Sequence, residues 1–181
     1  MQILLKILGI FAGVITLLMG FGFTLPGQAH VERDIVISAS ATDVFPYISH
    51  FEEWNNWSPW AKVDPNADFV LTGSGVDQRM EWASDNPDVG QGSQEVTTLE
   101  SPTLMKTHLN FEGQGIADAS FHLQEQDGKT LVTWSLDSDM SEKTPLLLKP
   151  ITNYFAVMMD GMIGPQYEIG LRNLKNLVEQ S

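Results

Sequence analysis

The chain lacks cysteine and contains few basic residues. Its 181 residues include no cysteine, which excludes a disulfide framework, a thiolate zinc site and a cysteine nucleophile. Ten lysines and arginines stand against 23 aspartates and glutamates, and the formal net charge at pH 7 is −13. Nucleic-acid phosphates and anionic lipid surfaces repel a chain of this charge. We therefore expect no nucleic-acid partner.

The chain also lacks the short motifs of the common catalytic and metal sites. It has no P-loop, no H-E-x-x-H and no Ser/His/Asp arrangement at a recognisable spacing. Residues 64–68 begin like a calcium loop, but Phe69 stands where such a loop needs glycine and Gly75 where it needs glutamate. His108 and His122 have no companion carboxylate at ligand spacing. The sequence therefore predicts no catalytic residue, no metal site and no cofactor.

A long apolar run occupies the N-terminus. The 19 residues from Ile7 to Leu25 carry no ionisable side chain, and a helix from Ile3 to Leu25 is long enough to cross a hydrocarbon core of about 30 Å. A secretory signal has a shorter apolar region, although residues 27–29 offer a small-residue cleavage site. We interpret residues 1–29 as a transmembrane anchor, or a signal, with a short tether, and residues 30–181 as the folded domain.

Two features of the apolar run bear on topology and assembly. Lys6 precedes the run, whereas Arg33 beyond it is flanked by acidic residues, so the positive-inside rule places the C-terminal part outside the cytoplasm. In a bacterium the protein is then a single-pass inner-membrane protein with a periplasmic domain. Gly9 and Gly13 form a G-x-x-x-G pattern that allows a weak homodimer, and the alternative is that glycines are simply common in spanning helices.

The segment after the tether predicts one strand and one or two short helices. Residues 31–37 alternate in the manner of a strand. Ser40 or Thr42 is suited to cap a short helix that follows. Pro59 limits the tryptophan-rich stretch 53–60 to a turn or a short helix.

The central part of the chain predicts a meander of antiparallel strands. From Ala67 to Asp137, five or six alternating apolar runs are separated by turn signals, and Asp127-Gly128 predicts a two-residue hairpin turn. By the same alternation Asp118 and His122 point outward, and residues 137–139 are expected to form a solvated loop. The residues expected to face the core are Ala117, Ala119, Phe121, Leu123, Val132, Trp134 and Leu136.

The final third, from about Pro150 to Glu179, has helical spacing in two apolar stripes. The first stripe is Ile151, Phe155, Met158, Met159 and Met162, and the second is Tyr167, Leu171, Leu174 and Val178. The two stripes are offset near Gly161, Gly164 and Pro165, so we expect one long helix that is kinked near Pro165. A sheet that curls around this helix buries its apolar face, which makes the fold class α+β.

Several pieces of the soluble part together resemble a known superfamily. They are Val31-Glu32-Arg33, Val44-Phe45, Trp54, Trp57-Ser58-Pro59-Trp60, Asp64-Pro65, Gly73, Gly75, Trp82, Gly90, Gly92, Thr133-Trp134, Gly170-Leu171 and Asn173-Leu174-Lys175. This pattern covers about residues 31–179 and is similar to the SRPBCC (START-like, polyketide cyclase/dehydrase) superfamily, in particular to its bacterial branch with an N-terminal membrane span. The resemblance implies a helix-grip fold, in which a curved seven-stranded antiparallel sheet surrounds a long C-terminal helix. It also implies an apolar cavity between sheet and helix, and it leaves the chemistry undecided.

The candidate ligand-binding residues are the large apolar side chains that are expected to line this cavity. They are Trp54, Trp57, Trp60, Met80, Trp82, Phe111, Phe121, Trp134, Phe155, Met158, Met159 and Met162. Methionines adapt to varied apolar ligands and tryptophans can cover a cavity mouth, while ordinary core packing is the alternative for both. We expect a membrane-anchored domain that binds a small hydrophobic or amphipathic ligand, lipid or polyketide-like. The alternatives are a cyclase, hydratase or hydrolase of the same fold and a non-catalytic interaction or scaffold domain.

Overall fold

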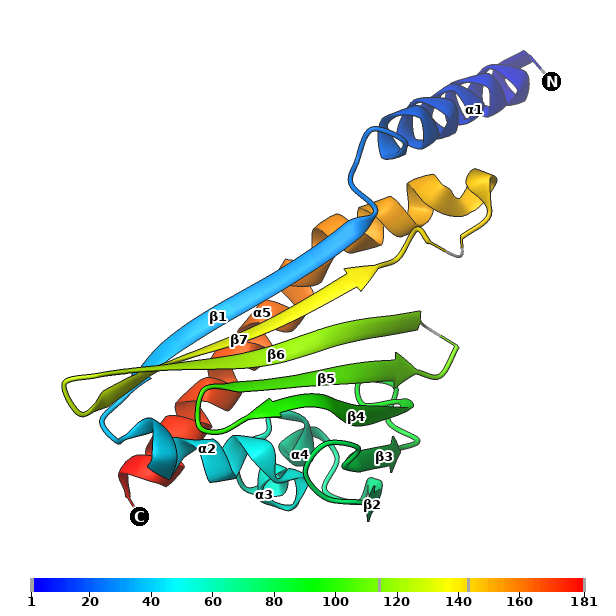
Figure 1. Cartoon of the computed structure of the whole chain (residues 1–181). Coiled ribbons are helices and arrows are strands. Elements are labelled where there is room, and N and C mark those ends of the chain that lie inside the picture. The colour runs from blue at the N-terminus through cyan, green and yellow to red at the C-terminus, as the bar shows by residue number, and fades with distance from the viewer. Residues whose placement is uncertain (1, 114, 143, 181) are drawn as a thin grey trace.

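The computed structural model of the chain describes residues 2–113, 115–142 and 144–180, so Met1 and Ser181, at the outer ends of the two expected segments, lie outside it. A long N-terminal helix projects from a body in which a sheet and a second long helix pack together (Figure 1). The elements are α1 (Gln2–Gly22), β1 (Gln28–Ile37), α2 (Ala41–Ser49), α3 (Phe51–Trp57), α4 (Trp60–Val63), β2 (Asp68–Thr72), β3 (Arg79–Ala83), β4 (Gln91–Glu100), β5 (Leu104–Phe111), β6 (Gly115–Gln126), β7 (Lys129–Asp139), the 3₁₀ turn η1 (Leu146–Leu148) and α5 (Lys149–Glu179).

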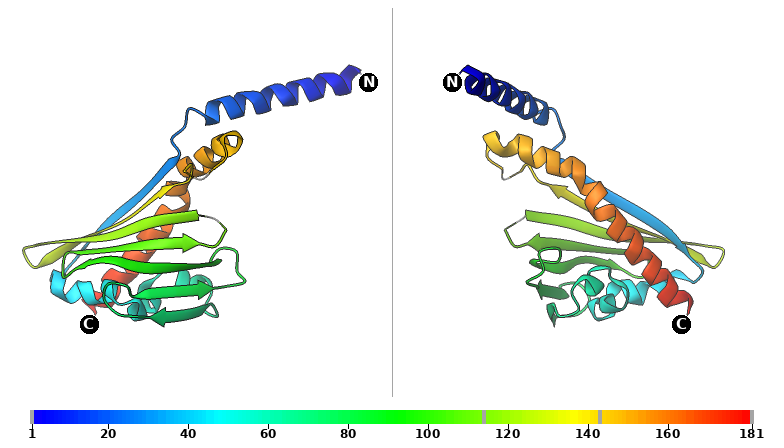
Figure 2. Two further views of the ribbon diagram at one scale, coloured as in Figure 1. Left: turned by 45° about the vertical axis from the view of Figure 1, so that its right-hand side comes forward. Right: turned by 180° about the vertical axis from the view of Figure 1, so that it is seen from behind.

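The strands form one antiparallel sheet in the order β1-β7-β6-β5-β4-β3-β2. The first strand therefore pairs with the last strand of the meander. Helix α5 and the short helices α2 to α4 lie on the same face of this sheet, which we call the inner face (Figure 2). This arrangement confirms the expected α+β helix-grip architecture, with seven strands, a long C-terminal helix and one preceding apolar helix.

The predicted faces of the central strands are confirmed. The seven residues expected to face the core are all buried, and Asp118 and His122 are exposed on the opposite, outer face. Asp127 and Gly128 have φ values of 53° and 71°, as a hairpin turn with two left-handed residues requires. Ser40 caps α2, because its side-chain oxygen accepts a hydrogen bond from the backbone N–H of Asp43.

The prediction of a loop at Asp137-Ser138-Asp139 is wrong. These residues continue β7 and pair with residues 28–30 of β1. The strand extends because β1 begins at Gln28, three residues before the alternating segment that predicted it. Apolar alternation marks strand residues only where the inner side is apolar, and here Ser138 occupies the inner position.

Helix α5 is continuous from Lys149 to Glu179 and runs through Pro165, as one long helix was predicted to do. Its first turns point away from the axis of the remainder (Figure 2). The rest of α5 lies along the edge strand β1, where Lys175 Nζ donates to the carbonyl of Val36 at 2.7 Å and Glu179 Oε1 accepts from the N–H of Ser38 at 2.7 Å. Side chains of the helix thus satisfy one backbone carbonyl of the edge strand and the backbone N–H of the residue that follows the strand.

Candidate functional site

An aromatic cluster fills the space between the sheet and the C-terminal half of α5. It consists of Trp54, Trp57, Phe121, Trp134 and Tyr167. The rings of Trp134 and Tyr167 are stacked with centroids 3.7 Å apart, and those of Phe121 and Trp134 lie 4.8 Å apart. Trp57 is fully buried. At this end of the grip, the protein's own side chains occupy the volume that was expected to hold a ligand.

Local features explain how the cluster packs so closely. Gly170 brings α5 against the sheet, since a Cβ there would lie 2.9 Å from the Trp134 ring. The indole N–H groups of Trp54 and Trp57 donate to backbone carbonyls at 2.8 and 2.9 Å. Trp60 is half-buried at the margin and packs edge-on against Trp134 and Tyr167. Three of the candidate tryptophans are therefore core residues, and Trp60 covers their edge.

The inner face of the sheet is less covered toward β3 and β5. Trp82 and Phe111 are half-buried, with ring centroids 5.9 Å apart in an edge-on arrangement. Met80 is buried beside Gln94, its neighbour on β4. Gln94 donates to the hydroxyl of Thr107 at 2.9 Å, and both side chains are buried on the inner face. This end of the grip therefore combines apolar walls with one buried polar pair.

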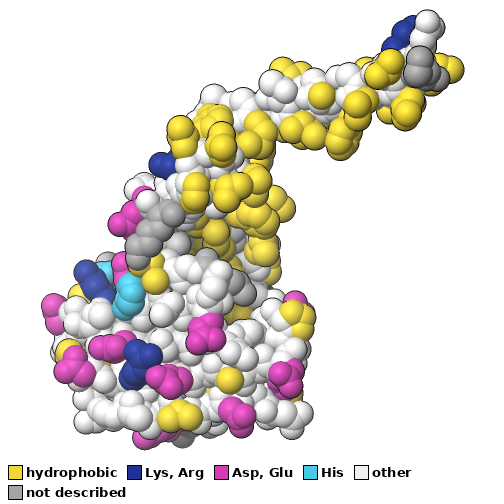
Figure 3. Space-filling model, turned by 90° about the vertical axis from the view of Figure 1, so that its right-hand side faces the viewer, with side chains coloured by type: hydrophobic (Ala, Val, Ile, Leu, Met, Phe, Trp, Pro, Cys, Tyr) yellow, Lys and Arg dark blue, Asp and Glu magenta, His cyan; other side chains and the backbone are white. Residues whose placement is uncertain are grey.

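The N-terminal half of α5 exposes its apolar stripe. Phe155 is 51% exposed, and Met158 and Met162 are each 58% exposed. Met159 and Ile163, which come from neighbouring positions, are partly buried and pack against the core. Hydrophobic side chains gather along α1 and down the neck that joins it to the body (Figure 3). The twelve candidate residues therefore do not surround one enclosed cavity.

An ionic clamp joins β1 to α5 between these two halves. Arg33 occupies an inner position of β1, and its guanidinium contacts the carboxylates of Asp160 at 2.8 Å and Glu168 at 3.0 Å. Gly164 leaves room for this group, because a Cβ there would overlap the guanidinium. The hydrogen bonds from Arg33 hold the pKa of Asp160 below its usual value. The sequence analysis used Arg33 for topology and for the family resemblance and did not predict the clamp, although strand alternation places Arg33 on the same side as Val31 and Ile35.

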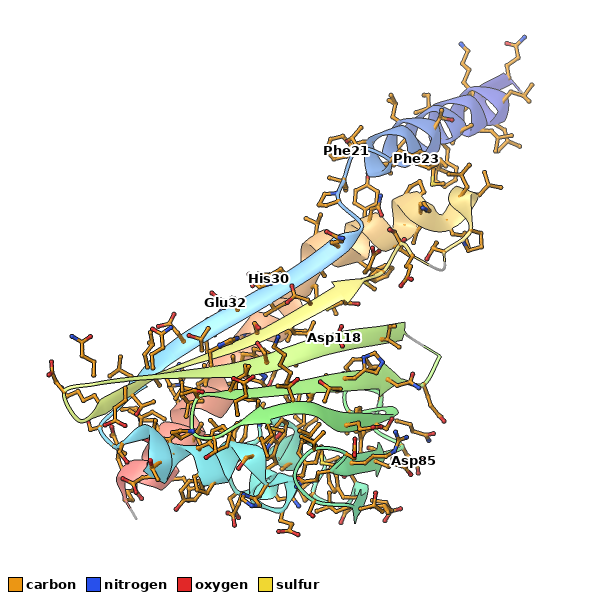
Figure 4. All side chains as sticks on the ribbon, viewed as in Figure 1. Phe21, Phe23, His30, Glu32, Asp85 and Asp118 are labelled. Atoms are coloured by element: carbon orange, nitrogen blue, oxygen red, sulfur yellow. The ribbon has the colours of Figure 1, made fainter. Side chains whose placement is uncertain are left out.

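Two polar grooves lie on the outer face of the sheet. The first, of about 320 Å³, is bordered by Arg79 and Glu81, and the second, of about 480 Å³, is bordered by His30, Lys106 and Asp118. Figure 4 shows His30 and Asp118 on neighbouring parts of this face. Both grooves are open to solvent and lie on the side of the sheet away from α5.

Two histidines on the outer face pair with carboxylates of adjacent strands. His108 Nδ1 lies 2.7 Å from Asp118 on the adjacent strand, and His30 Nδ1 lies 2.7 Å from Asp137. The hydrogen bond with Asp137 raises the pKa of His30. These are cross-strand pairs, which chain spacing does not reveal. Among the described residues, no group of three or more His, Asp or Glu side chains is arranged to hold a metal ion.

Solved structures with this fold are distant in sequence. A START superfamily protein from Mycobacterium smegmatis has a TM-score of 0.58 at 17% identity, over 83% of this chain and 97% of that chain. Hypothetical protein jhp0584 from Helicobacter pylori has a TM-score of 0.58 at 9% identity, over 82% and 87%. Ara h 8.0201 has a TM-score of 0.55 at 11% identity, over 85% and 99%. At such identities the likeness shows the fold alone.

Sequence comparison identifies the family. No curated protein sequence matches the chain. The family model described as polyketide cyclase / dehydrase and lipid transport matches residues 28–179, which run from the first residue of β1 to the last residue of α5. The resemblance seen in the sequence is thereby confirmed, and the chain belongs to the polyketide cyclase/dehydrase and lipid transport family of the SRPBCC superfamily.

Proposed function

We propose that the protein is a membrane-anchored domain of this family that binds a small hydrophobic or amphipathic ligand, lipid or polyketide-like, between the sheet and α5. The observation that carries the proposal is the exposed apolar stripe of Ile151, Phe155, Met158 and Met162 on the N-terminal half of α5. Each Å² of apolar surface removed from water contributes about 25 cal/mol of favourable free energy. An apolar ligand that covers this stripe therefore gains binding free energy in proportion to the area it covers.

The ligand lies at the open end of the grip, because the aromatic cluster fills the other end. Met159 and Ile163 continue the stripe into the core, and Trp82 and Phe111 offer half-buried rings on the sheet side. Methionine side chains adjust their shape to varied apolar groups. The buried pair of Gln94 and Thr107 provides hydrogen-bonding groups for one polar end of an amphipathic ligand.

A catalytic role has less support from the titratable groups. The Asp, Glu and His residues of the described strands occupy outer positions, apart from Glu125, whose carboxylate accepts a hydrogen bond from the backbone of Ala41. Arg33 is engaged by two carboxylates. Burial raises the pKa of Tyr167, so its hydroxyl stays protonated at neutral pH and cannot act as a general base. Binding without covalent chemistry is therefore the favoured function.

Membrane anchoring through α1 has two structural supports. Among the described residues, α1 is the one helix long and apolar enough to cross a membrane, although an N-terminal signal sequence meets the same criterion. Cleavage after Ala29 would cut β1 inside its pairing with β7, where Ala29 is buried opposite Ser138. Asn153 also binds the end of α1, since its side-chain amide donates to the carbonyls of Gly22 and Leu25. Both observations favour a retained anchor over a removed signal.

The orientation and the self-association of the anchor are predictions that rest on the sequence. Lys6, near the N-terminal end of α1, favours a body outside the cytoplasm, which in a bacterium is the periplasm. A Cβ at Gly9 or Gly13 would meet no atom within 4 Å, so this face of α1 is open for a second helix in a weak homodimer. Protease digestion of intact spheroplasts tests the orientation, because only an extracytoplasmic body is cleaved.

Photolabelling of the full chain in vesicles that contain a photoreactive fatty-acid analogue tests the binding function. We expect labelled peptides from residues 155–163 and from the Phe111 region, in addition to α1. Met158→Asp should lower labelling near Phe111 about tenfold, because a charge in the apolar site opposes binding. Val70→Asp, a matched change on the outer face, should leave it unchanged. Labelling confined to α1, together with an empty organic extract of the purified protein, would favour the scaffold function instead.

A further inference from the structure

A second apolar surface lies next to the C-terminal end of α1. Leu146 and Leu147 in η1 are 68% and 77% exposed, and Leu148 and Ile151 continue the same surface into the first turn of α5. We call these four residues the leucine patch. Figures 1 and 2 show η1 and the start of α5 beside the C-terminal part of α1, and in Figure 3 hydrophobic side chains run without interruption from α1 onto this part of the neck.

Polar and apolar contacts hold the first turns of α5 at a definite level along α1. The Tyr154 hydroxyl donates to the carbonyl of Leu18 at 2.8 Å, and the Asn153 amide donates to that of Gly22 at 3.0 Å. Gly22 packs so closely on Pro150 that a Cβ would lie 2.7 Å from it. Leu18 lies one turn, about 6 Å, before Gly22. The start of α5 is therefore level with the last turn of α1.

The charge of this segment is opposite to that of the chain. Residues 144–159 contain no aspartate or glutamate and one lysine, Lys149, in a protein of net charge −13. Basic and apolar segments that lie at a bilayer surface combine these two properties, and tyrosine is enriched at the same level. Tyr154 reaches the last turn of α1 from this segment. The exposed apolar surface and the absence of acidic side chains thus match one occupant, the interfacial region of a bilayer.

We propose that the leucine patch inserts into the interfacial region of the bilayer beside α1 and forms a second membrane contact. The proposal rests on the anchoring part of the proposed function. It also deepens that function, because the stripe from Ile151 to Met162 then begins at the bilayer surface. An amphipathic lipid that leaves the bilayer then has a continuous apolar surface to follow toward the open end of the grip.

Single-cysteine labelling of the full chain tests the patch, and the absence of native cysteine makes each site unique. Leu147→Cys, Ile10→Cys in the middle of α1, and Val70→Cys on the outer face each carry the same environment-sensitive fluorophore. The proteins are reconstituted into vesicles of phosphatidylcholine with a minority of phosphatidylglycerol. Quenching is measured with lipids that carry a spin label near the headgroup or near the acyl-chain end.

We expect the spin label near the headgroup to quench the fluorophore at Leu147→Cys strongly. The label near the acyl-chain end should quench the fluorophore at Ile10→Cys, and neither label should quench the one at Val70→Cys. Quenching at Ile10→Cys without quenching at Leu147→Cys overturns the leucine patch proposal and leaves the anchor intact. Absence of quenching at Ile10→Cys overturns the anchor and the patch together. A third outcome also overturns the proposal: unlabelled Leu147→Cys chains form a disulfide with each other, and the labelled variant shows no quenching by lipid. A second copy of the chain then covers the patch.

Discussion

The two halves of α5 have similar apolar stripes but opposite surroundings. In the C-terminal half, Tyr167, Leu171 and Leu174 are buried against the aromatic cluster and α3. In the N-terminal half, Phe155 and Met158 face solvent. The two stripes lie on different sides of the helix, and α3 and Trp60 pack against the C-terminal half. An apolar helix face therefore indicates that something covers it, and only the arrangement of neighbouring elements tells whether the cover is the protein's own core.

The largest expected effect separates the filled end from the open end. Trp57→Ala should reduce the free energy of unfolding by about 3–5 kcal/mol, because it removes a fully buried ring from the core. Met158→Ala, on the exposed stripe, should change it by less than about 0.5 kcal/mol. Urea denaturation of the full chain in mild detergent, followed by circular dichroism, measures both. Similar losses for the two variants would contradict the division of α5 into a packed half and an exposed half.

The next effect concerns the boundary between the halves. Gly164→Ala should destabilise the protein by about 1–3 kcal/mol, since its Cβ displaces the Arg33 guanidinium. Gly161→Ala is the matched control one turn away, where a Cβ meets no atom within 4 Å, and it should stabilise the helix by up to about 1 kcal/mol. The same denaturation experiment compares them.

A double-mutant cycle then tests the cause. In an Arg33→Ala background the cost of Gly164→Ala should shrink markedly, because the overlapping group is gone. An unchanged cost would show that Gly164 matters for a reason other than the clamp.

The smallest expected effect is the pH dependence of the clamp. The hydrogen bonds from Arg33 lower the pKa of Asp160 in the folded state below 3.8, its value in the unfolded chain. The Asp160 carboxylate therefore binds a proton less tightly in the folded state than in the unfolded chain. The stabilisation is therefore present above about pH 3.8 and is lost as the pH falls through the lowered pKa of the folded state. NMR titration of the Asp160 carboxyl should show the low pKa in the wild type and its return toward the ordinary value in Arg33→Ala. An equal pKa in both proteins would disprove the link.

Local patterns in the sequence were sufficient for most of the fold. Alternation assigned the faces of β6 and β7, Asp127-Gly128 predicted its hairpin, and Ser40 was one of two proposed helix caps. These features depend on neighbours in the chain, and the family resemblance supplied the number of strands. The missed end of β7 had no apolar signal, because its pairing depends on where β1 begins.

The candidate site was less predictable because it depends on distant contacts. Helical spacing showed that Phe155 and Met158 share a face, but not that α3 and α4 stop short of it. The clamp joins Arg33 to residues more than a hundred positions away. The pair of His108 and Asp118 depends on the register of two strands. Such contacts follow from the assembled sheet and not from spacing along the chain.

The hydrogen bonds that Lys175 and Glu179 form with Val36 of β1 and with Ser38 just after it have a consequence for solubility. A ten-residue edge strand with free backbone groups is a template on which strands of other molecules can add. Here α5 runs along that edge and binds one backbone group of the strand and one of the residue that follows it, while β2 at the opposite edge is only five residues long. Both borders of the sheet are thereby poor sites for edge-to-edge aggregation.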